Sequence, residues 1–340
     1  MPTTTPQASK RGCSMLRKTG KDIPEFIFER SRMWRDEQTQ KIAAATSMVD
    51  IIGEYAACPV CGKSTLRAHV SIFNLDYLEC LECRHIFCRQ IFSTESLGMV
   101  YESYNTYLPE DTSLFRKRVA SFAVPKVDFV LSSIDQKKGL WVDLGCGPGE
   151  ILYEAMNRGW AVLGVEPSKM AWQNCQKNGI DAVNEYLTDK NVGRFVKQAS
   201  IVSLFSVIEH VNEPDKLIST ISESMHSGSF LVVEVPRTPS LSAFSIMSAP
   251  LIVSRHLAPP FHLRIYSEES LSLSLEKCGI TMKAIWTFGQ DYFELLSTVA
   301  YNENIPLNYW PELPSSASMA QRAIDESGLS DSMLVVGIKE

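Results

Sequence analysis

The sequence predicts an α/β fold, a mostly parallel sheet with helices on both faces, preceded by a small cysteine-rich module and a helical segment. The first observation is a set of short apolar runs that alternate with amphipathic stretches, as is typical of strand–helix–strand units. The runs are "LWVDLGC", "AVLGVEP", "SIVSLFSV" and "SFLVVEVP". The second is a glycine-rich turn directly after the first run, and the third is a set of four paired cysteines upstream of it. A chain of 340 residues has room for one large domain and an accessory.

The elements follow in order along the chain. Residues 1–50 are expected to comprise a flexible tail, to about residue 22, and an N-terminal helical segment, since apolar residues at helical spacing begin only after the tail. The other predicted parts are a cysteine-rich module at 51–93, a helical connector at 94–128 and the large α/β domain at 129–340. The last apolar run, "SMLVVGIKE", predicts an edge strand.

Composition narrows the function classes. The apolar fraction is 45%, the charged fraction 21% and the formal net charge −6. The negative charge counts against a primary role in binding nucleic acid, whose phosphates attract basic proteins. No window approaches the roughly 18 consecutive apolar residues of a membrane span, and the N-terminal stretch lacks the apolar core of a signal peptide. We therefore expect a cytoplasmic protein whose thiols stay reduced.

Four cysteines form two Cys-x-x-Cys pairs separated by an eighteen-residue arm: Cys58, Cys61, Cys80 and Cys83. This spacing matches the four-thiolate zinc pattern. Gly62, directly after the first pair, permits the tight turn that such a knuckle needs. An all-thiolate tetrahedral zinc ion has no open coordination position, so the expected Zn²⁺ is structural.

The glycine turn "GCGPG" lies between a predicted strand and a predicted helix. Glycines there let the backbone turn sharply and approach a ligand closely. No Gly-Lys-Ser/Thr follows, which excludes the phosphate loop of nucleotide triphosphatases. Glu150 stands where the dinucleotide pattern has its third glycine, and its carboxylate would repel a pyrophosphate. Asp143 lies inside the strand, where a dinucleotide site needs no acid.

The next strand ends in "LGVEPS" and brings Glu166 to the carboxyl end of the neighbouring strand, where open α/β sheets bind ligands. A carboxylate there can accept both hydroxyls of a ribose. Asp143, the glycine turn and Glu166 together suit a nucleoside that is cationic rather than phosphorylated. The alternative is a helix-capping turn with an incidental surface glutamate.

The segments "VDLGCGPGE", "VEPS" and "SVIEHVNEP", in this order and spacing, resemble the class I S-adenosylmethionine-dependent methyltransferases of types 11 and 23. The likeness is greatest to the small-molecule branch with ubiquinone-pathway O-methyltransferases and antibiotic-sugar methyltransferases. It covers residue 129 to the end and implies a Rossmann-like sheet that binds S-adenosyl-L-methionine. The glycine loop would lie along the methionine part, and the acid after the second strand would hold the ribose. The residues so assigned to the cofactor are Asp143, Gly145, Cys146, Gly147, Gly149, Glu166, Pro167 and Ser206.

A hydroxyl or acidic carbon acceptor needs a base to take its proton, and His is the usual candidate near neutral pH. Glu209 and His210 follow the fourth strand and are expected to face the acceptor. They act either as base and orienter or, as in some ubiquinone-pathway relatives, as ligands of a divalent ion. The alternative is a helix-start pair that only fixes the loop.

A long apolar segment, residues 236–266, follows the fifth strand and is predicted to form a lid over the acceptor pocket. It contains His256 and His262. Of these, His262 is the third catalytic candidate, and its alternative role is to fix the lid by hydrogen bonds. Arg264 and Tyr266 are candidates for binding an anionic or sugar-like acceptor.

Three functions stay open. We expect a methyltransferase that acts on a small-molecule or sugar-type acceptor by O- or C-methylation, with a zinc ribbon that shapes the acceptor pocket or a homodimer contact. The second function is a zinc-ribbon RNA methyltransferase, which would need a basic ribbon, whereas the arm between the cysteine pairs mixes basic and acidic residues. The third is a non-catalytic cofactor-binding scaffold, against which the intact glycine turn and its ribose acid argue.

Overall fold

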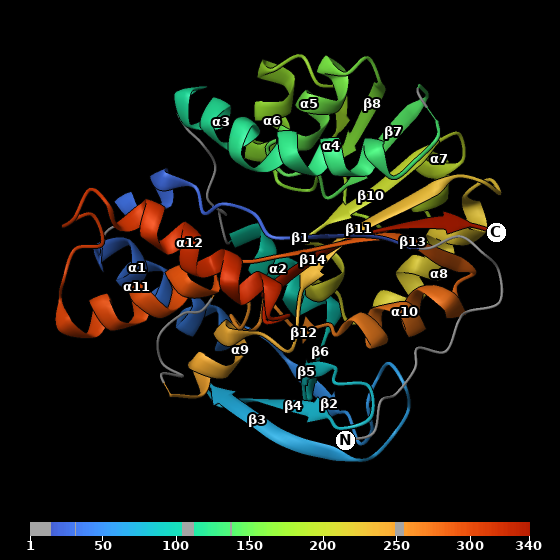
Figure 1. Cartoon of the computed structure of the whole chain (residues 1–340). Helices are drawn as coiled ribbons and strands as arrows, with labels where there is room; N and C mark the ends of the chain where they lie inside the picture. Colours follow the sequence, from blue (N-terminus) through green and yellow to red (C-terminus); the bar gives the residue numbers. More distant parts are fainter. Residues whose placement is uncertain (1–14, 31, 104–111, 137, 249–254) are drawn as a thin grey trace, which may run out of the picture.

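The structure is a computed structural model, and it describes residues 15–30, 32–103, 112–136, 138–248 and 255–340. Its centre is an eight-stranded sheet with the order β1-β13-β14-β11-β10-β7-β8-β9 (Figure 1). The strands of this sheet are β1 (Leu16–Thr19), β7 (Leu140–Leu144), β8 (Ala161–Val165), β9 (Ala182–Val183), β10 (Ile201–Phe205), β11 (Phe230–Pro236), β13 (Ile280–Phe288) and β14 (Ser332–Lys339).

Strands β7 to β11 are all parallel, so the predicted α/β fold with a mostly parallel sheet is confirmed. The chain runs from β7 outward to β8 and β9, and then returns to the other side of β7 for β10 and β11. Open α/β sheets bind ligands at the carboxyl ends of the strands beside such a reversal. The prediction of an edge strand at the end of the chain is wrong. β14 lies between β11 and β13, antiparallel to both, because both neighbours pair with it along almost its whole length.

Helices cover both faces of this sheet. In Figure 1, α4 and α5 lie on one side of it and α8 and α10 on the other. Adjacent residues of β7 enter opposite cores, Trp141 on the side of α4 to α6 and Val142 on the side of α7, α8 and α10, as the two-residue period of a strand requires. These helices are α4 (Val124–Ser132), α5 (Glu150–Asn157), α6 (Lys169–Lys177), α7 (Val192–Val196), α8 (Pro214–Ser224) and α10 (Glu268–Lys277).

The N-terminal segment predicted as a flexible tail to about residue 22 contains a strand. β1 pairs in parallel with β13 and forms one edge of the sheet. Arg17 of β1 forms an ion pair with Glu268 of α10 at 2.5 Å. The four residues of β1 are exposed and show no apolar alternation, so only their pairing with a distant strand reveals them. Residues 1–14 of the predicted tail lie outside the described residues.

The cysteine-rich module shares a core with the large domain. Its main sheet has the order β12-β5-β4-β3, so the predicted lid segment supplies β12 to it. Cys58, Cys80 and Cys83 pack in the same apolar cluster as α8 and α10. The hydroxyl of Ser267 donates to the carbonyl of Cys83 at 2.5 Å. The strands are β2 (Ile51–Glu54), β3 (Leu66–Ile72), β4 (Leu75–Cys80), β5 (Ile86–Cys88), β6 (Gln90–Phe92) and β12 (Arg264–Ile265).

Three helices pack beside the carboxyl end of β13. They are α1 (Arg32–Thr46), α11 (Asp291–Glu303) and α12 (Leu313–Glu326). α11 and α12 share an apolar cluster with a 3-10 turn at Glu25–Glu29, and Arg35 of α1 donates a hydrogen bond to Ser297 of α11. α11 and α12 are inserted between β13 and β14, and Figure 1 shows them next to α1. The remaining helices are α2 (Thr94–Ser103), α3 (Thr112–Arg118) and α9 (Leu241–Ser245). Within the described ranges, no helix has the length and apolar character to cross a membrane. Residues 249–254 of the predicted lid lie outside the described residues.

Candidate active site

A cavity of about 340 Å³ opens at the carboxyl ends of β7, β10 and β11, beside the reversal of strand order. Five residues predicted to bind the cofactor line it, namely Asp143, Gly145, Cys146, Gly147 and Ser206. Among the described residues, Gly149, Glu166 and Pro167 are not part of this lining. The predicted cofactor residues therefore divide into a group that faces the cavity and a group directly behind it.

The turn after β7 holds its backbone against the neighbouring elements. The amides of Gly145 and Cys146 donate to the carbonyl of Val165 at 2.7 and 3.2 Å. Gly145 has a φ of 76°, and a Cβ there would lie 2.9 Å from Cγ2 of Val207. Because no side chain fits at this position, the backbone itself forms the wall of the cavity.

Gly149→Ala is expected to lower the free energy of unfolding by about 2–5 kcal/mol, since a left-handed backbone costs roughly 1–2 kcal/mol and overpacking roughly 1–3 kcal/mol. Gly149 begins α5 with a φ of 91°, and a Cβ there would lie 2.6 Å from Ile180 and 2.9 Å from Cys175, both buried. Urea unfolding measures the loss. Gly147→Ala is the control, because its φ of 53° carries the backbone cost while no atom lies within 4 Å of the added Cβ. Equal losses of unfolding free energy in the two variants would contradict the predicted clash of the added Cβ with Ile180 and Cys175.

Asp143 lies buried at the end of β7. The hydroxyl of Ser203 donates to its Oδ1 at 2.6 Å, and the same hydroxyl accepts from Nε1 of Trp141 at 2.8 Å. Burial raises the pKa of Asp143 to about 7, while the hydrogen bond from Ser203 lowers it. A cation in the cavity would favour the ionised carboxylate, so this position suits a positively charged ligand.

Glu166 ties the loop after β8 to the glycine turn. Its two carboxylate oxygens accept from the amides of Gly147 and Ser168, each at 2.8 Å. Burial raises its pKa, and these two backbone bonds act in the opposite direction. A carboxylate offers about four acceptor positions, so capacity for two ribose hydroxyls is left. The side chain of Asn184 donates to the carbonyls of Glu166 and Pro167 at 2.8 Å each and holds the same loop.

The cavity also carries cationic side chains that the sequence motifs do not reveal. Lys126 pairs with Glu234 at 2.6 Å, and Arg118 pairs with Glu150 at 2.5 Å. The Arg118 pair offsets the negative charge of Glu150, which begins α5 directly after the glycine turn. Further cations in the lining are Lys21, Arg30 and Arg255. Lys21 and Arg30 come from the N-terminal segment, and Arg255 comes from the predicted lid. Lys21 reaches the cavity because β1 joins the sheet. Since these residues are distant from the glycine turn in the sequence, no local pattern predicts their place in the cavity.

The three predicted catalytic residues lie together. Ser206 follows β10 with a φ of 54°, which is uncommon for a residue other than glycine, and a 3-10 turn then carries Glu209 and His210. The rings of His210 and His262 meet edge to face with centroids 4.6 Å apart. One ligating atom from each of Glu209, His210 and His262 lies within 4.8 Å of the others. Within the described part of the chain, this group stands outside the lining of the 340 Å³ cavity.

Burial sets the protonation of this group. Glu209 is fully buried, and among the described residues neither of its carboxylate oxygens has a hydrogen-bond donor in normal geometry. Burial raises the pKa of Glu209 to about 8 and lowers that of His210 to about 4, although the carbonyl of Phe261 lies 2.8 Å from Nδ1 of His210. Near neutral pH the pair is therefore an uncharged acid beside a neutral imidazole. A neutral imidazole can accept a proton or bind a metal ion.

Two candidates for acceptor binding serve a different purpose. The guanidinium of Arg264 is buried and donates to the carbonyls of Val211 and Asn212 at 2.6 Å each. Tyr266 is fully buried, and its amide donates to the carbonyl of Pro236. The Arg264 contacts join the predicted lid to the loop after β10, and the Tyr266 contact joins the two ends of the lid, so neither supports a role in holding an acceptor.

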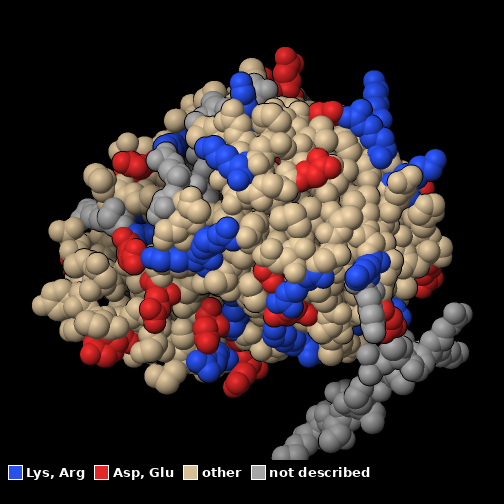
Figure 2. All heavy atoms as spheres, turned by 90° about the horizontal axis from the view of Figure 1, so that it is seen from above, with Lys and Arg blue, Asp and Glu red and all other residues tan. Residues whose placement is uncertain are grey.

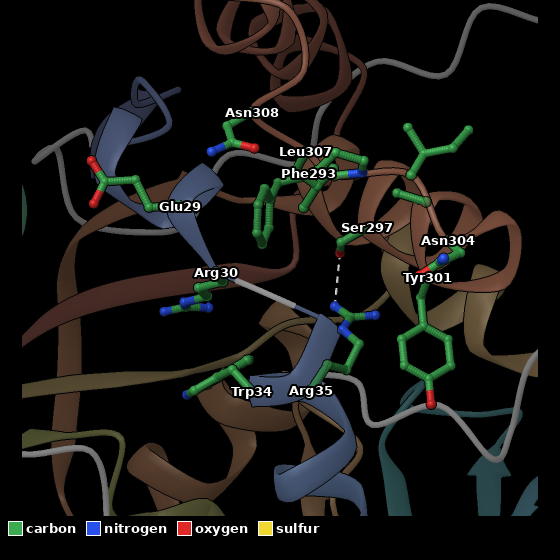
Figure 3. A pocket seen from close by; sticks show the side chains of 13 residues that line it. Glu29, Arg30, Trp34, Arg35, Phe293, Ser297, Tyr301, Asn304, Leu307 and Asn308 are labelled. Carbon is green, nitrogen blue, oxygen red and sulfur yellow. Dashed lines mark hydrogen bonds between the residues drawn. The ribbon is translucent and has the colours of Figure 1, made fainter.

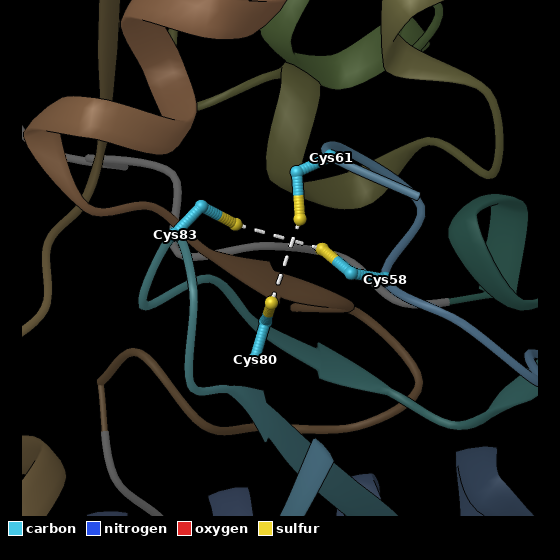
Figure 4. A group of neighbouring side chains, drawn as sticks. All are labelled: Cys58, Cys61, Cys80 and Cys83. Atoms are coloured by element: carbon cyan, nitrogen blue, oxygen red, sulfur yellow. Dashed lines mark hydrogen bonds between the residues drawn. The ribbon is translucent and has the colours of Figure 1, made fainter. Parts of the chain in front are cut away.

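The four cysteine sulfurs converge on one point (Figure 4). The sulfurs of Cys58 and Cys83 are 3.6 Å apart, those of Cys61 and Cys80 are 3.5 Å apart, and all four lie within 4.8 Å of one another. A tetrahedral ion with metal–sulfur bonds of about 2.3 Å places its sulfurs about 3.8 Å apart. The thiols therefore fit an ion of the size of zinc and leave no position open for a substrate.

Comparisons with known proteins bear on the large domain. Residues 115–284, half of the chain, match the sequence profile of a family described as a methyltransferase domain. No curated protein matches the chain in sequence.

Similar solved structures include a possible histamine N-methyltransferase from Thermotoga maritima, with 15% identity, 72% of this chain and 100% of that chain covered, and a TM-score of 0.46. A geranyl diphosphate C-methyltransferase from Streptomyces coelicolor A3(2) is 14% identical, with 68% of this chain and 88% of that chain covered and a TM-score of 0.43. A magnesium protoporphyrin IX methyltransferase from Synechocystis PCC 6803 is 11% identical, with 73% and 95% covered and a TM-score of 0.44. At these scores the likeness carries no argument about the acceptor.

Proposed function

Because the chain belongs to the S-adenosylmethionine-dependent methyltransferases, as its match over residues 115–284 shows, we propose that it methylates a small-molecule or sugar-type acceptor at an oxygen or a carbon. The observation that carries the proposal is the cavity at the reversal of strand order, walled by the glycine turn and Asp143. S-adenosyl-L-methionine supplies an electrophilic methyl group on a positively charged sulfur. A buried acid at the cavity wall suits that charge better than it suits a phosphate.

The residues that line the cavity and those directly behind it have different roles in binding. In the proposal, the backbone of Gly145, Cys146 and Gly147 contacts the amino-acid part of the cofactor. Glu166, with Pro167 beside it, accepts from the ribose hydroxyls. Gly149 starts α5 and fixes the turn. Methyl transfer from a sulfonium is an in-line displacement, so alignment of the two reactants supplies much of the acceleration.

The cluster of Glu209, His210 and His262 has two candidate uses. A neutral imidazole can take the proton from an acceptor hydroxyl, and in His210 the carbonyl of Phe261, 2.8 Å from Nδ1, holds the ring, while Glu209 lies 3.8 Å from its Nε2. Alternatively, the three residues bind a divalent ion, and the carboxylate oxygens of Glu209, buried and without a hydrogen bond in normal geometry among the described residues, fit such an ion. In both uses the cluster acts on the acceptor and leaves cofactor binding unchanged.

His210→Ala and His262→Ala are each expected to lower kcat by roughly 10²–10⁴-fold, the usual contribution of a general base, with the affinity for S-adenosyl-L-homocysteine unchanged. The rate at which labelled methyl groups enter the small-molecule fraction of a cell extract, relative to wild type, measures turnover, and calorimetry measures affinity. His256→Ala is the control, since its ring stacks on His262 with centroids 6.0 Å apart but is outside the cluster. Normal turnover in both variants would contradict the assignment. Elemental analysis distinguishes the two uses. A second metal ion per chain in the wild-type protein that is missing from His262→Ala indicates a metal site.

The zinc proposed at the four cysteines is structural. The module holds β12 through its pairing with β5, and β12 belongs to the predicted lid segment. Ser267, next to that strand, donates to the carbonyl of Cys83. We propose that the ion keeps the lid segment docked beside the Glu209–His210 loop.

The surface favours a small acceptor over RNA. On the face shown in Figure 2, Lys and Arg side chains are interspersed with Asp and Glu. In the zinc module, Arg67 and Arg84 both pair with Glu79, at 2.5 and 2.8 Å. A protein that binds a phosphate backbone presents basic side chains that are not already paired with acids.

Calorimetric titration with S-adenosyl-L-homocysteine tests the cofactor site of the wild-type protein. We expect one binding site per chain. Absence of binding at the highest soluble concentration would contradict the proposed function.

A further inference from the structure

A second cavity, of about 240 Å³, lies between the start of α1, the turn at Glu25–Glu29 and α11 (Figure 3). We refer to it as the α1–α11 cavity. Arg30 lines both this cavity and the 340 Å³ cavity. α11 connects the two cavities as well. Gln290 at its start lines the 340 Å³ cavity, and Phe293, three residues further on, lines the α1–α11 cavity. The two cavities therefore adjoin.

Arg35 gives the α1–α11 cavity a buried charge. The residue is only 8% exposed. Its Nη2 donates to the hydroxyl of Ser297 at 2.7 Å and lies 3.7 Å from a carboxylate oxygen of Glu294. Its Nη1 is buried and has no hydrogen-bond partner among the described residues. A buried charged donor without an acceptor is costly, so the position indicates a ligand that supplies one.

The remaining lining defines the shape of that ligand. Figure 3 shows the side chains of Arg30, Trp34 and Phe293 around the same space as Arg35. The guanidinium of Arg30 lies 4.8 Å from the ring centroid of Trp34. The acid in the lining is Glu29, which is exposed. Two guanidinium groups beside aromatic rings suit an oxyanion attached to a flat or apolar body, because the planar fork of arginine matches carboxylate and phosphate oxygens.

We propose that the α1–α11 cavity binds the methyl acceptor and selects one that carries a carboxylate or phosphate group on an aromatic or apolar body. Arg35 and Arg30 receive the oxyanion, and Phe293 and Trp34 contact the body. The inference rests on the proposed function, because the molecule held here is the acceptor only when the adjoining cavity holds the cofactor. Binding of the oxyanion itself depends on Arg35 and Arg30 and does not require a bound cofactor.

The test uses benzoate and phenyl phosphate as probes, with benzyl alcohol as the neutral analogue, titrated into the full chain and followed by ligand-observed NMR. At least one of the two anions is expected to bind, at least about tenfold more tightly than benzyl alcohol, because a charge-assisted hydrogen bond is worth that much or more. Which anion binds more tightly identifies the oxyanion. Arg35→Gln is expected to weaken that binding by at least about tenfold, and Arg35→Lys by less, since it keeps the charge but loses the fork. Arg89→Gln, which removes an exposed pair with Glu54, is the control and is expected to bind as wild type.

Ala300→Phe provides a second variant that fills the cavity and keeps every charge, in case Arg35→Gln loosens the contact between α1 and α11. It is expected to abolish anion binding while S-adenosyl-L-homocysteine binds normally. Anion affinities that match wild type in both Arg35→Gln and Ala300→Phe overturn the inference. A wild-type chain that binds the anion but no S-adenosyl-L-homocysteine contradicts the proposed function instead, so the two failures are distinguishable.

Discussion

Glu166→Ala is expected to abolish measurable binding of S-adenosyl-L-homocysteine. The variant removes the acceptor of two ribose hydroxyls, and each hydrogen bond to a charged group is worth about 1.5–3 kcal/mol, so affinity falls by roughly 10²–10⁴-fold. It also leaves the amides of Gly147 and Ser168 without their acceptor, which loosens the glycine turn. Calorimetric titration of the variant beside the wild-type chain measures the loss.

Two further variants separate the ribose contact from a loss of folding. Glu166→Gln keeps the size of the side chain and one acceptor oxygen, so an intermediate affinity is expected. Glu185→Ala removes a nearby acid that pairs with Arg194, and it is expected to bind as tightly as the wild type. Thermal unfolding shows whether each variant is folded. Wild-type affinity in a folded Glu166→Ala would refute the ribose assignment.

Cys58→Ser is expected to lose the bound zinc and with it the order of residues 51–93. Structural zinc contributes about 10–16 kcal/mol to the folding of small zinc modules, and a serine oxygen is a poor substitute for a thiolate. Because the module pairs with β12, protection of the lid segment is expected to fall next, while β7 to β10 stay protected. Elemental analysis measures the zinc, and hydrogen exchange followed by mass spectrometry measures the order of unfolding.

Cys278→Ser is the matched control for this prediction. Its thiol is outside the four-cysteine cluster and donates to the carbonyl of Asp215 at 3.5 Å, a contact that a serine hydroxyl can also make. Its zinc content is expected to equal that of the wild type. A full zinc content in Cys58→Ser would contradict the four-thiolate site.

Local patterns explain why much of the fold was predictable. The strand, the glycine turn and the helix around Asp143 follow one another directly in the chain, so their geometry is encoded within a dozen residues. The spacing of Cys58 to Cys83 likewise predicts the convergence of the four sulfurs. In each case the residues that meet are either adjacent or joined by a short hairpin.

The features that the sequence patterns did not predict depend on contacts between residues far apart in the chain. β1 is four exposed residues whose only strand signal is its pairing with β13. β14 is an interior strand because, after the α11–α12 insertion, the chain returns between β11 and β13. Arg30 and Arg35 are more than a hundred residues from the glycine turn, and nothing near them in the sequence marks a cavity. The protonation of Glu209 and His210 depends on burial that only the folded chain creates.

The most direct test of the central claim is to incubate the protein with S-adenosyl-L-methionine labelled in its methyl group, together with separated cell fractions. One fraction holds small metabolites and the other holds RNA. We expect label in the small-molecule fraction, enriched among its anionic members, and none in RNA. Label in RNA alone would contradict it.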